Sequence, residues 1–529
     1  MTSSNYDIAI IGSGLGSLAC ASFIAQLYNK KIIVVEQYSQ AGGLSQSFRN
    51  KDNVSFEIGI HQVGELNNSS MFSKLMKLIS GGNSHWRKLP DTFIKFHFPD
   101  FIYEVIAGEK KQTQKLITLF PDEKENIIQY YKDIEMITQW YRNFTLKSIE
   151  VDKETLQNLF NSPVGELAML TTQDYLDNRF NNEKIKSLLG SHWTDYGIPP
   201  RSSAFLKHAI LVNNHKDGVY YPEYGSEHLI SSIEKAIRNH GGELIFNTLV
   251  KKINHINGKA TSLTVLNKIT NEETEIKANF FISGIGAINT YKYLFDKSLV
   301  KNKLTSINNF KKYGVSFVKL YATLKSNPKK IGADASLSWV YSSYDHDLNF
   351  KNKNKLLKGI ISQYSISFPS LKKTTNAKHS MKINSLINYS AFQEWEKMQM
   401  TDDTYAILKN TIGKTLLNDA ERLYPGLNDL IESWDIITPK SSKKITQHFN
   451  GNIFGLPDTP ERFKNLNFNC FTPLKNVFLT GSDITTSGVY AAVLSGMITT
   501  SAIFKDNRFF MKVFKELAMI ERNTEKIMV

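Results

Sequence analysis

The chain has 529 residues, of which 41% are hydrophobic and 12% aromatic, and its formal net charge is +14. This length exceeds what one hydrophobic core usually supports, so we expect at least two domains. Only two cysteines occur, Cys20 and Cys470, which excludes a disulfide framework and a cysteine-rich metal site and favours a reducing compartment. Met1 to Asp7 carries no basic signal region, so we expect a cytoplasmic protein.

The positive charge is spread over many short lysine clusters, such as the one between Lys351 and Lys358. This spacing favours a solvated basic surface, and we expect no nucleic-acid partner. A second interpretation is attraction to an anionic membrane surface, where an apolar substrate would dissolve.

The first predicted element is the apolar strand Ile8 to Ile11, which leads directly into a glycine turn and a helix. Gly12 and Gly14 occupy the first two positions of a G-x-G-x-x-G pattern, and Ser17 replaces the last glycine. Such a turn lets the backbone approach a pyrophosphate, which the start of the following helix then binds. The order of strand, turn and helix therefore predicts a dinucleotide-binding βαβ unit.

The second predicted strand ends at Glu36, whose carboxylate can accept hydrogen bonds from an adenosine ribose. Gly42 and Gly43 follow, and they remove side chains from a second stretch of backbone close to the ligand. A nicotinamide-binding unit does not need this second glycine pair. The combination favours a flavin dinucleotide.

Two later blocks repeat the alternation of helix and strand. One runs from Gly218 to Ile253 and is followed by strand-like runs at 260–266 and 275–283. The other is a buried strand ending at Gly481-Ser482-Asp483, before a helix of small residues from about Gly488 to Ile503. Asp483 is placed to accept from ribityl hydroxyls, and the helix can direct its positive end at the flavin N1 and C2 carbonyl region.

The segments between these blocks are long, aromatic and rich in charged helices, with a strand pattern from Val315 to Leu324. We expect them to form one substrate domain built from two insertions. The predicted divisions are a discontinuous FAD-binding domain of 1–70, 218–295 and 465–510, a substrate-binding domain of 71–217 and 296–464, and a C-terminal amphipathic helix of 511–529.

Over nearly its whole length the chain resembles the FAD-dependent phytoene desaturase, carotenoid isomerase and retinol saturase family, within the amine-oxidase-like flavoproteins. Beyond the glycine motifs, the shared segments are Phe56 to His61, Trp193 to Pro200, Tyr220 to Ser226, Ser367 to Ser370 and Leu479 to Asp483. Departures are Glu57 for a usual Asp, Ser17 for the last glycine and Ser482 for a residue that is often Gln.

The resemblance implies an α/β fold with a Rossmann-like FAD-binding domain of the GR2 type and an inserted α+β substrate domain. It also implies that His61 lies near the isoalloxazine and that the backbone of Val250 contacts adenine, although Val250 could equally be a plain core residue. The predicted cofactor-binding residues are Gly12, Gly14, Leu15, Gly16, Ser17, Glu36, Gly42, Gly43, Leu44, His61, Val250, Gly481, Asp483 and Val489.

The predicted activity is hydride transfer between FAD and a C=C or C–C bond of a long apolar substrate, such as a carotenoid, retinoid, polyene or acyl chain. His61 and Tyr196 are the predicted proton donors. The alternatives are a redox-neutral cis-trans isomerase, an FAD amine oxidase, and a non-enzymatic lipid-binding escort resembling Rab GDP-dissociation inhibitors. NAD(P)H or another electron donor or acceptor has no dedicated motif, and the oligomeric state does not follow from the sequence.

Several features weigh less than they first suggest. Gly284-Ile285-Gly286 resembles a second dinucleotide turn, but no strand ending in an acid or arginine follows it. Residues 484–504 carry no charge, yet their many hydroxyl side chains favour a buried cofactor helix over a membrane span. The tail places Phe509, Val513 and Leu517 near one helical face, which either docks on the protein or lies on a membrane.

The histidines His192, His208 and His215 lie in the first insertion and could line a substrate tunnel. For each one alone, a hydrogen-bonded structural role is the better interpretation. No metal-ligand spacing and no nucleophile motif of the G-x-S-x-G type is present, so no metal is predicted.

Overall fold

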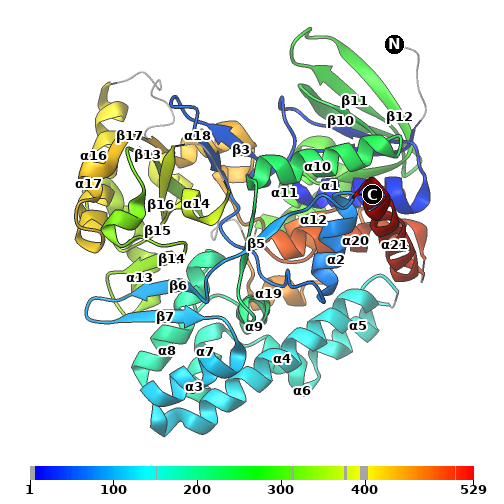
Figure 1. Cartoon of the computed structure of the whole chain (residues 1–529). Helices are drawn as coiled ribbons and strands as arrows, with labels where there is room; N and C mark the ends of the chain where they lie inside the picture. The colour runs from blue at the N-terminus through cyan, green and yellow to red at the C-terminus, as the bar shows by residue number, and fades with distance from the viewer. Residues whose placement is uncertain are drawn as a thin grey trace.

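The computed structural model describes residues 6–150, 152–308, 310, 315–374, 378–393, 403–506 and 508–528. Two seven-stranded sheets organise these residues, and a group of helices lies beneath them in Figure 1. The strands of the first sheet come from residues 6–35, 243–283 and 477–479, and those of the second come from residues 92–106 and 316–437.

The first sheet has a parallel core in the order β18-β12-β1-β2-β9. The first half of the long strand β12 also pairs with β11, and β11 pairs with β10. Both pairings are antiparallel. The strand bounds are β1 (Tyr6–Ile11), β2 (Ile32–Val35), β9 (Glu243–Ile245), β10 (Thr248–Ile256), β11 (Lys259–Asn267), β12 (Glu273–Ser283) and β18 (Val477–Leu479).

Alternation along β1 assigns its side chains to two hydrophobic cores. Ile8 and Ile10 face a helical layer, whereas Ala9 and Ile11 face the core shared with β10, β11 and the segment after β12. The helices of the first layer are α1 (Leu15–Tyr28), α2 (Met71–Ile79), α10 (Gly225–Asn239), α20 (Val489–Phe504) and α21 (Phe509–Met528), and the segment after β12 contains α11 (Ala287–Asn289), η4 (Thr290–Leu294) and α12 (Lys297–Asn308).

The second sheet has the strand order β17-β13-β16-β15-β14-β6-β7 and is mostly antiparallel. One face packs on α16 (Asp403–Leu423), with Leu320 and Ile383 in that core, and α16 and α17 (Leu427–Leu430) cover its outer side in Figure 1. The strand bounds are β6 (Thr92–His97), β7 (Ile102–Ile106), β13 (Ser316–Leu324), β14 (Leu337–Tyr341), β15 (Gln363–Ser367), β16 (His379–Ile387) and β17 (Ile431–Ile437).

The first insertion contributes most of the remaining helices, which gather at one end of the molecule, in cyan and green in Figure 1. Their bounds are α3 (Glu109–Leu119), α4 (Lys124–Lys147), α5 (Lys153–Phe160), α6 (Pro163–Ala168), α7 (Thr172–Arg179), α8 (Glu183–Gly190), η3 (Ser191–Asp195) and α9 (Phe205–His215). Short elements complete the fold: η1 (Gly43–Ser45), β3 (Ser47–Arg49), β4 (Ser55–Glu57), β5 (Trp86–Lys88), β8 (Tyr220–Pro222), η6 (Pro328–Ile331), α13 (His346–Asn352), η7 (Lys353–Lys358), α14 (Pro369–Lys372), η8 (Tyr389–Phe392), α18 (Pro439–Thr446), η9 (Phe449–Gly451), α19 (Pro460–Lys464) and η10 (Ser482–Ile484), with η2 (Pro121–Glu123) between α3 and α4.

The C-terminal helix α21 packs on the protein through one apolar face. Phe509, Val513 and Leu517 are buried, and the Phe509 ring meets the Phe23 ring edge-on at 5.4 Å. Within the described ranges, none of the helices is both long and apolar enough to cross a membrane.

Candidate functional site

Four chain segments meet where the parallel strands β1, β2, β12 and β18 end. In an open α/β sheet, ligands bind at this carboxyl edge. The segments are the turn after Ile11, the residue after Val35, the turn after Ser283 and the loop after Leu479.

The turn after β1 has the backbone that a pyrophosphate site requires. Gly12 has φ +82°, a conformation that residues with side chains rarely adopt. Helix α1 begins at Leu15 with Gly14 as its N-cap and without a side-chain cap. Its first N–H groups therefore have no intrahelical acceptor and remain available to an anion.

Close packing around α1 explains the small residues of the glycine motif. A Cβ on Gly16 would lie 3.1 Å from the backbone of Gly481, and a Cβ on Gly284 would lie 1.9 Å from Ser17 Oγ. Gly284 to Gly286 thus pack against the first glycine turn. Ser17 stands in place of the last glycine of the motif. Its side chain fits because the residue that it contacts, Gly284, has no side chain.

Glu36 lies at the end of β2 with its carboxylate directed at the glycine turn. Its Oε2 accepts from the backbone N–H of Ser13 at 2.8 Å and from Ser13 Oγ at 2.6 Å, and its Oε1 accepts from the Tyr38 N–H at 3.0 Å. These bonds fix the carboxylate next to the position predicted for the adenosine ribose.

The second glycine pair is in direct contact with the first. Gly42 donates its N–H to the Ser13 carbonyl at 2.9 Å, and a Cβ on Gly43 would lie 3.0 Å from Gly14 Cα. Leu44 follows, and a Cβ on Gly59 would lie 2.6 Å from its carbonyl oxygen. The segment 58–61, which carries His61, therefore packs on the residues that continue the dinucleotide turn.

Asp483 is buried in η10 and binds two other segments. Its Oδ2 accepts from the Ala287 N–H at 2.6 Å, and its Oδ1 accepts from the Leu456 N–H at 2.7 Å. Nearby, α20 begins at the half-buried Val489 after Gly488, without a side-chain cap. The positive end of α20 thus lies close to the loop that carries Gly481 and Asp483.

Val250 lies on β10 near the end of β2. The Thr248 N–H, two residues earlier, donates to the Glu36 carbonyl at 2.9 Å. The Val250 side chain is buried in the core that also contains Ile33 and Val35. Its position is compatible with both sequence interpretations, a core side chain and a backbone next to the adenine.

The two predicted proton donors lie on separate segments, and no hydrogen bond joins them among the described residues. Burial and the nearby ammonium groups of Lys382, Lys319 and Lys372 hold the pKa of His61 well below its ordinary value, so its imidazole is neutral. Tyr196 is buried, which raises the pKa of its hydroxyl, and the hydroxyls of Ser203 and Thr172 beside it offset part of that rise.

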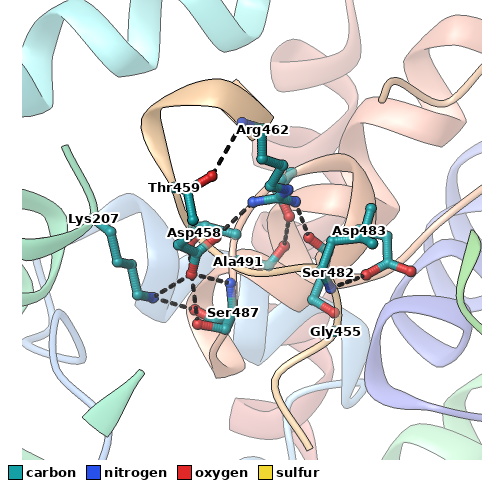
Figure 2. A network of polar contacts seen from close by, with 12 residues as sticks. Lys207, Gly455, Asp458, Thr459, Arg462, Ser482, Asp483, Ser487 and Ala491 are labelled. Atoms are coloured by element: carbon teal, nitrogen blue, oxygen red, sulfur yellow. Dashed lines mark hydrogen bonds and ion pairs between the residues drawn. The ribbon is translucent and has the colours of Figure 1, made fainter. Parts of the chain in front are cut away.

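A buried polar network supports the loop that carries Asp483 (Figure 2). Asp458 pairs with Arg462 at 2.5 Å and accepts from Thr486 Oγ1 and Ser487 Oγ at 2.8 and 2.9 Å. Arg462 also donates to the Ser482 carbonyl at 2.7 Å, and Lys207 donates to the Ser487 carbonyl at 2.6 Å. Lys207 lies on α9, so this network joins the first insertion to the loop before α20.

A cavity in the first insertion contains two of the three predicted tunnel histidines. His192 and His215 line it together with Phe93, Phe96 and Tyr130. The third, His208, is fully buried behind it and bonds the Tyr130 hydroxyl at 2.7 Å. The structural role expected for a single histidine therefore describes His208, while His192 and His215 face the cavity.

The sequence interpretation missed two groups of residues. The first is the network around Asp458 and Arg462. The second is a set of buried lysines beside His61: Lys319, Lys372, Lys373 and Lys382. A signal for one member of the second group was present, since Lys319 is the one charged residue in the predicted strand from Val315 to Leu324.

Comparisons with known proteins agree with this geometry. Residues 10–77 match the model of an NAD(P)-binding Rossmann-like domain. The chain is 26% identical to an all-trans-retinol 13,14-reductase of Danio rerio, over 98% of this chain and 89% of the relative. It is 23% identical to a chloroplastic prolycopene isomerase of Daucus carota, over 95% of this chain and 81% of the relative.

Among solved structures, a variant of putrescine oxidase has a TM-score of 0.61 and 13% identity, covering 95% of this chain and 99% of the other. This similarity supports the predicted fold class, an α/β fold with a Rossmann-like domain and an inserted second domain. The predicted resemblance agrees with these comparisons: over nearly its whole length the chain is similar to retinol 13,14-reductases and prolycopene isomerases.

Proposed function

We propose that the protein is an FAD-dependent oxidoreductase that transfers hydride to or from a C=C or C–C bond of a long apolar substrate. The observation that carries this proposal is the packing of segment 58–61. This segment contacts Leu44 of the dinucleotide turn on one side and accepts a hydrogen bond from Lys319 of the second sheet on the other. It therefore joins a dinucleotide site to the sheet of the second domain.

The chain's own residues would bind and orient the cofactor. The uncapped start of α1 and the Gly12 to Gly14 turn would hold the pyrophosphate, and Glu36 would accept from the adenosine ribose. Asp483 would accept from the ribityl chain with the lone pairs that its two backbone donors leave free. When bound, FAD would supply the hydride chemistry that no side chain can perform.

The substrate side must exclude water and deliver a proton if the reaction is a saturation. Tyr196 is the simpler of the two predicted donors, because its buried hydroxyl keeps its proton. His61 is neutral, so it would act through a neutral N–H. An adjacent lysine would then have to replace its proton.

A redox-neutral isomerase is the second candidate, and the prolycopene isomerase relative favours it. The two activities differ in stoichiometry. A saturase consumes one reducing equivalent pair for each double bond, whereas an isomerase needs only a catalytic amount of reductant and leaves the mass of the substrate unchanged.

Purification followed by absorption spectroscopy and mass spectrometry tests the proposal. We expect a yellow protein with a flavin spectrum and a co-purified polyene, terpenoid or acyl compound. Anaerobic photoreduction followed by added polyene should reoxidise the flavin and add two mass units to the product. A colourless protein would favour a lipid-binding escort, and peroxide release with a water-soluble amine would favour an amine oxidase; either result contradicts the proposal.

Peripheral membrane contact is part of the same proposal, because an apolar substrate must enter from a lipid phase. Met511 and Phe514 of α21 are 65% and 45% exposed, and the chain carries a net charge of +14. Flotation with vesicles of anionic lipid tests this contact. Replacement of both residues by serine should reduce flotation, and unchanged flotation would remove α21 from membrane binding.

A further inference from the structure

Four lysine side chains are buried on one side of segment 55–61, and we call them the lysine cluster: Lys319, Lys372, Lys373 and Lys382. Their exposed fractions are 4%, 1%, 9% and 2%. Lysine is almost never buried to this extent without a charged partner. The cluster is therefore the strongest electrostatic anomaly of the described structure.

The register of the second sheet brings two of these lysines together. Lys319 on β13 pairs with Asn384 on β16, and Tyr321 pairs with Lys382. Directly paired residues point to the same face, so Lys319, Tyr321, Lys382 and Asn384 share one face. Lys372 and Lys373 reach the same segment from the end of α14.

Each lysine donates to a main-chain carbonyl of segment 55–61. Lys319 donates to Ile58 at 2.7 Å and Lys382 donates to Glu57 at 3.0 Å. Lys372 is 3.4 Å from the His61 carbonyl, and Lys373 is 3.2 Å from that of Ser55. An ammonium group has three donors, so most of the donors of Lys319, Lys372 and Lys382 have no acceptor within the described residues.

The cluster has one carboxylate in contact with it. Glu57 is buried and pairs with Lys373 at 2.6 Å, whereas Lys319, Lys372 and Lys382 have no ion pair among the described residues. Carbonyl oxygens satisfy donors but do not neutralise charge. Buried positive charge without a counter-charge is costly, so these amines must either lose protons or meet an anion.

Three polar atoms beside the cluster lack partners in the described structure. They are the Tyr321 hydroxyl, on a side chain that is 3% exposed, and two acceptors, Asn384 Oδ1 and Glu57 Oε2, on side chains that are each 1% exposed. Lys382 Nζ lies 5.9 Å from the centre of the Tyr321 ring. Buried polar atoms are normally satisfied, so an unpartnered hydroxyl on this face indicates a missing partner that can accept its proton.

We propose that the lysine cluster binds the carboxylate of the substrate, which is then a long-chain unsaturated acid. This inference rests on the proposed function and specifies its substrate class. Aromatic side chains provide the apolar continuation: Phe317 precedes Lys319 on the same face of β13, and its ring meets that of Phe454 at 6.0 Å. A substrate carboxylate bound beside His61 would place the first carbons of its chain next to segment 58–61, which packs on Leu44.

Titration of the cluster agrees with an absent anion. Burial, and then repulsion by Lys382, lowers the pKa of Lys319 and of Lys372 to about 7. Burial lowers the pKa of Lys382 to about 8. A bound carboxylate would raise all three values and keep the amines charged.

Calorimetry on the purified full-length holoprotein at pH 6.5 tests the proposal, with linoleate and linoleyl alcohol as probes below their aggregation limits. We expect linoleate to bind at least tenfold more tightly. The K372M and K382M variants should each weaken linoleate about tenfold and leave the alcohol unchanged. The matched control is K353M, since Lys353 is equally buried but donates to Phe350 in another part of the second domain.

Equal affinity for acid and alcohol, or equal losses for both probes in the cluster variants, would overturn the proposal. Tighter binding of octadecyl phosphate than of linoleate would overturn the assignment of a carboxylate. If a methionine variant does not fold, K382R, which keeps the charge, and K382Q, which removes it, provide the same comparison of acid and alcohol affinity.

Failure of this inference is distinguishable from failure of the proposed function. A yellow protein that reduces neutral polyenes but shows no preference for acids retains the proposed function and loses only the anion site. A colourless protein would contradict the proposed function. The ratio of its affinities for acid and alcohol would still test whether the lysine cluster binds a carboxylate.

Discussion

Asp483, near the end of the chain, accepts a 2.6 Å hydrogen bond from the backbone N–H of Ala287 in the middle of the chain. Its other carboxylate oxygen accepts from Leu456 at 2.7 Å. One side chain thus joins three distant segments at the edge of the first sheet, and a residue predicted from the sequence as a cofactor ligand is also a structural link.

This dual role predicts that D483A loses stability as well as flavin. Two hydrogen bonds to a buried carboxylate are worth about 3–6 kcal/mol together. We expect the free energy of unfolding of the cofactor-free protein to fall by that amount, and the purified variant to be colourless. D483N keeps one acceptor and should lie between the two proteins.

Denaturant titration followed by circular dichroism measures this difference. D435N is the matched control, because Asp435 accepts from Lys409 at an exposed position. An apoprotein of D483A as stable as the parent would limit Asp483 to a role in cofactor binding.

The first glycine turn predicts a separation between folding and binding. A Cβ on Gly14 would meet only Gly284 O, at 4.0 Å, whereas one on Gly16 would meet Gly481 at 3.1 Å and Ser495 Oγ at 2.9 Å. G14A should therefore keep the melting temperature of the apoprotein and lose FAD affinity. G16A should lower both. A G14A protein that binds FAD normally would contradict the assignment of this turn to the pyrophosphate.

Glu36 should contribute to affinity through charge. In the parent protein, one oxygen of Glu36 accepts from both the N–H and the hydroxyl of Ser13. The E36Q variant has an amide group in place of this carboxylate. Hydrogen bonds to charged groups are worth about 1.5–3 kcal/mol, so we expect FAD affinity to fall about 10- to 100-fold. Fluorescence titration of the apoprotein with FAD measures it, with E243Q on neighbouring β9 as the control. Equal affinity in E36Q and the parent would exclude Glu36 from the ribose site.

The lysine cluster predicts that the ligand-free protein becomes more stable as pH rises. The pKa of Lys319 and Lys372 is about 7 in the folded chain, against an ordinary 10.5 in the unfolded chain. Between these values the unfolded chain binds more protons, so the free energy of unfolding increases with pH. The charged and titratable groups facing the cluster are Glu57, His61, Lys373, Asp334, Tyr221 and Tyr321.

Thermal melts at pH 6, 7, 8 and 9 measure this trend, and linoleate affinity should fall over the same range. The K372M/K382M double variant should show a flatter pH dependence of its melting temperature. A parent protein whose melting temperature falls from pH 7 to pH 9 would contradict the neutral-amine description.

The network in Figure 2 predicts strong coupling between two residues. Removing Arg462 alone leaves the buried Asp458 carboxylate without its closest counter-charge, which typically costs about 3–5 kcal/mol. Lys207, 3.8 Å from Asp458, is the remaining counter-charge in R462M and the remaining buried charge in D458N/R462M, so the loss in the double variant should differ from the sum of the two single losses. Urea unfolding of the two single variants and the double variant measures the coupling, and additive effects would show that the pair is not a unit.

Much of the first sheet could be predicted because its determinants are local. The glycine turns, the acid after β2 and the small-residue helix α20 each have a short sequence pattern with a physical cause. The predicted strand Val315 to Leu324 and the helix from Gly488 agree with β13 and α20 within one residue.

The lysine cluster could not be predicted in the same way. Lys319, Lys372 and Lys382 come from separate elements, and only the pairing of β13 with β16 brings two of them to one face. The second role of Asp483 depends on backbone groups of Ala287 and Leu456, which no side-chain pattern reveals. Long-range pairing fixed both features, and a single sequence does not encode such pairing in any local signal.

The parallel pairing of β1 with β12 and of β12 with β18 also orders events during synthesis. β1 leaves the ribosome early, but its neighbour β12 begins at Glu273 and the next strand begins at Val477. β1 has an unpaired edge until β12 has been made, and β12 has one until β18 has been made; such edges are a hazard for aggregation during slow, non-local folding. A nascent chain therefore cannot complete the loop of Asp483 until nearly all of it has been made. Cofactor loading should be one of the last steps in its maturation, and truncation before β18 and Asp483 should leave an unloaded protein.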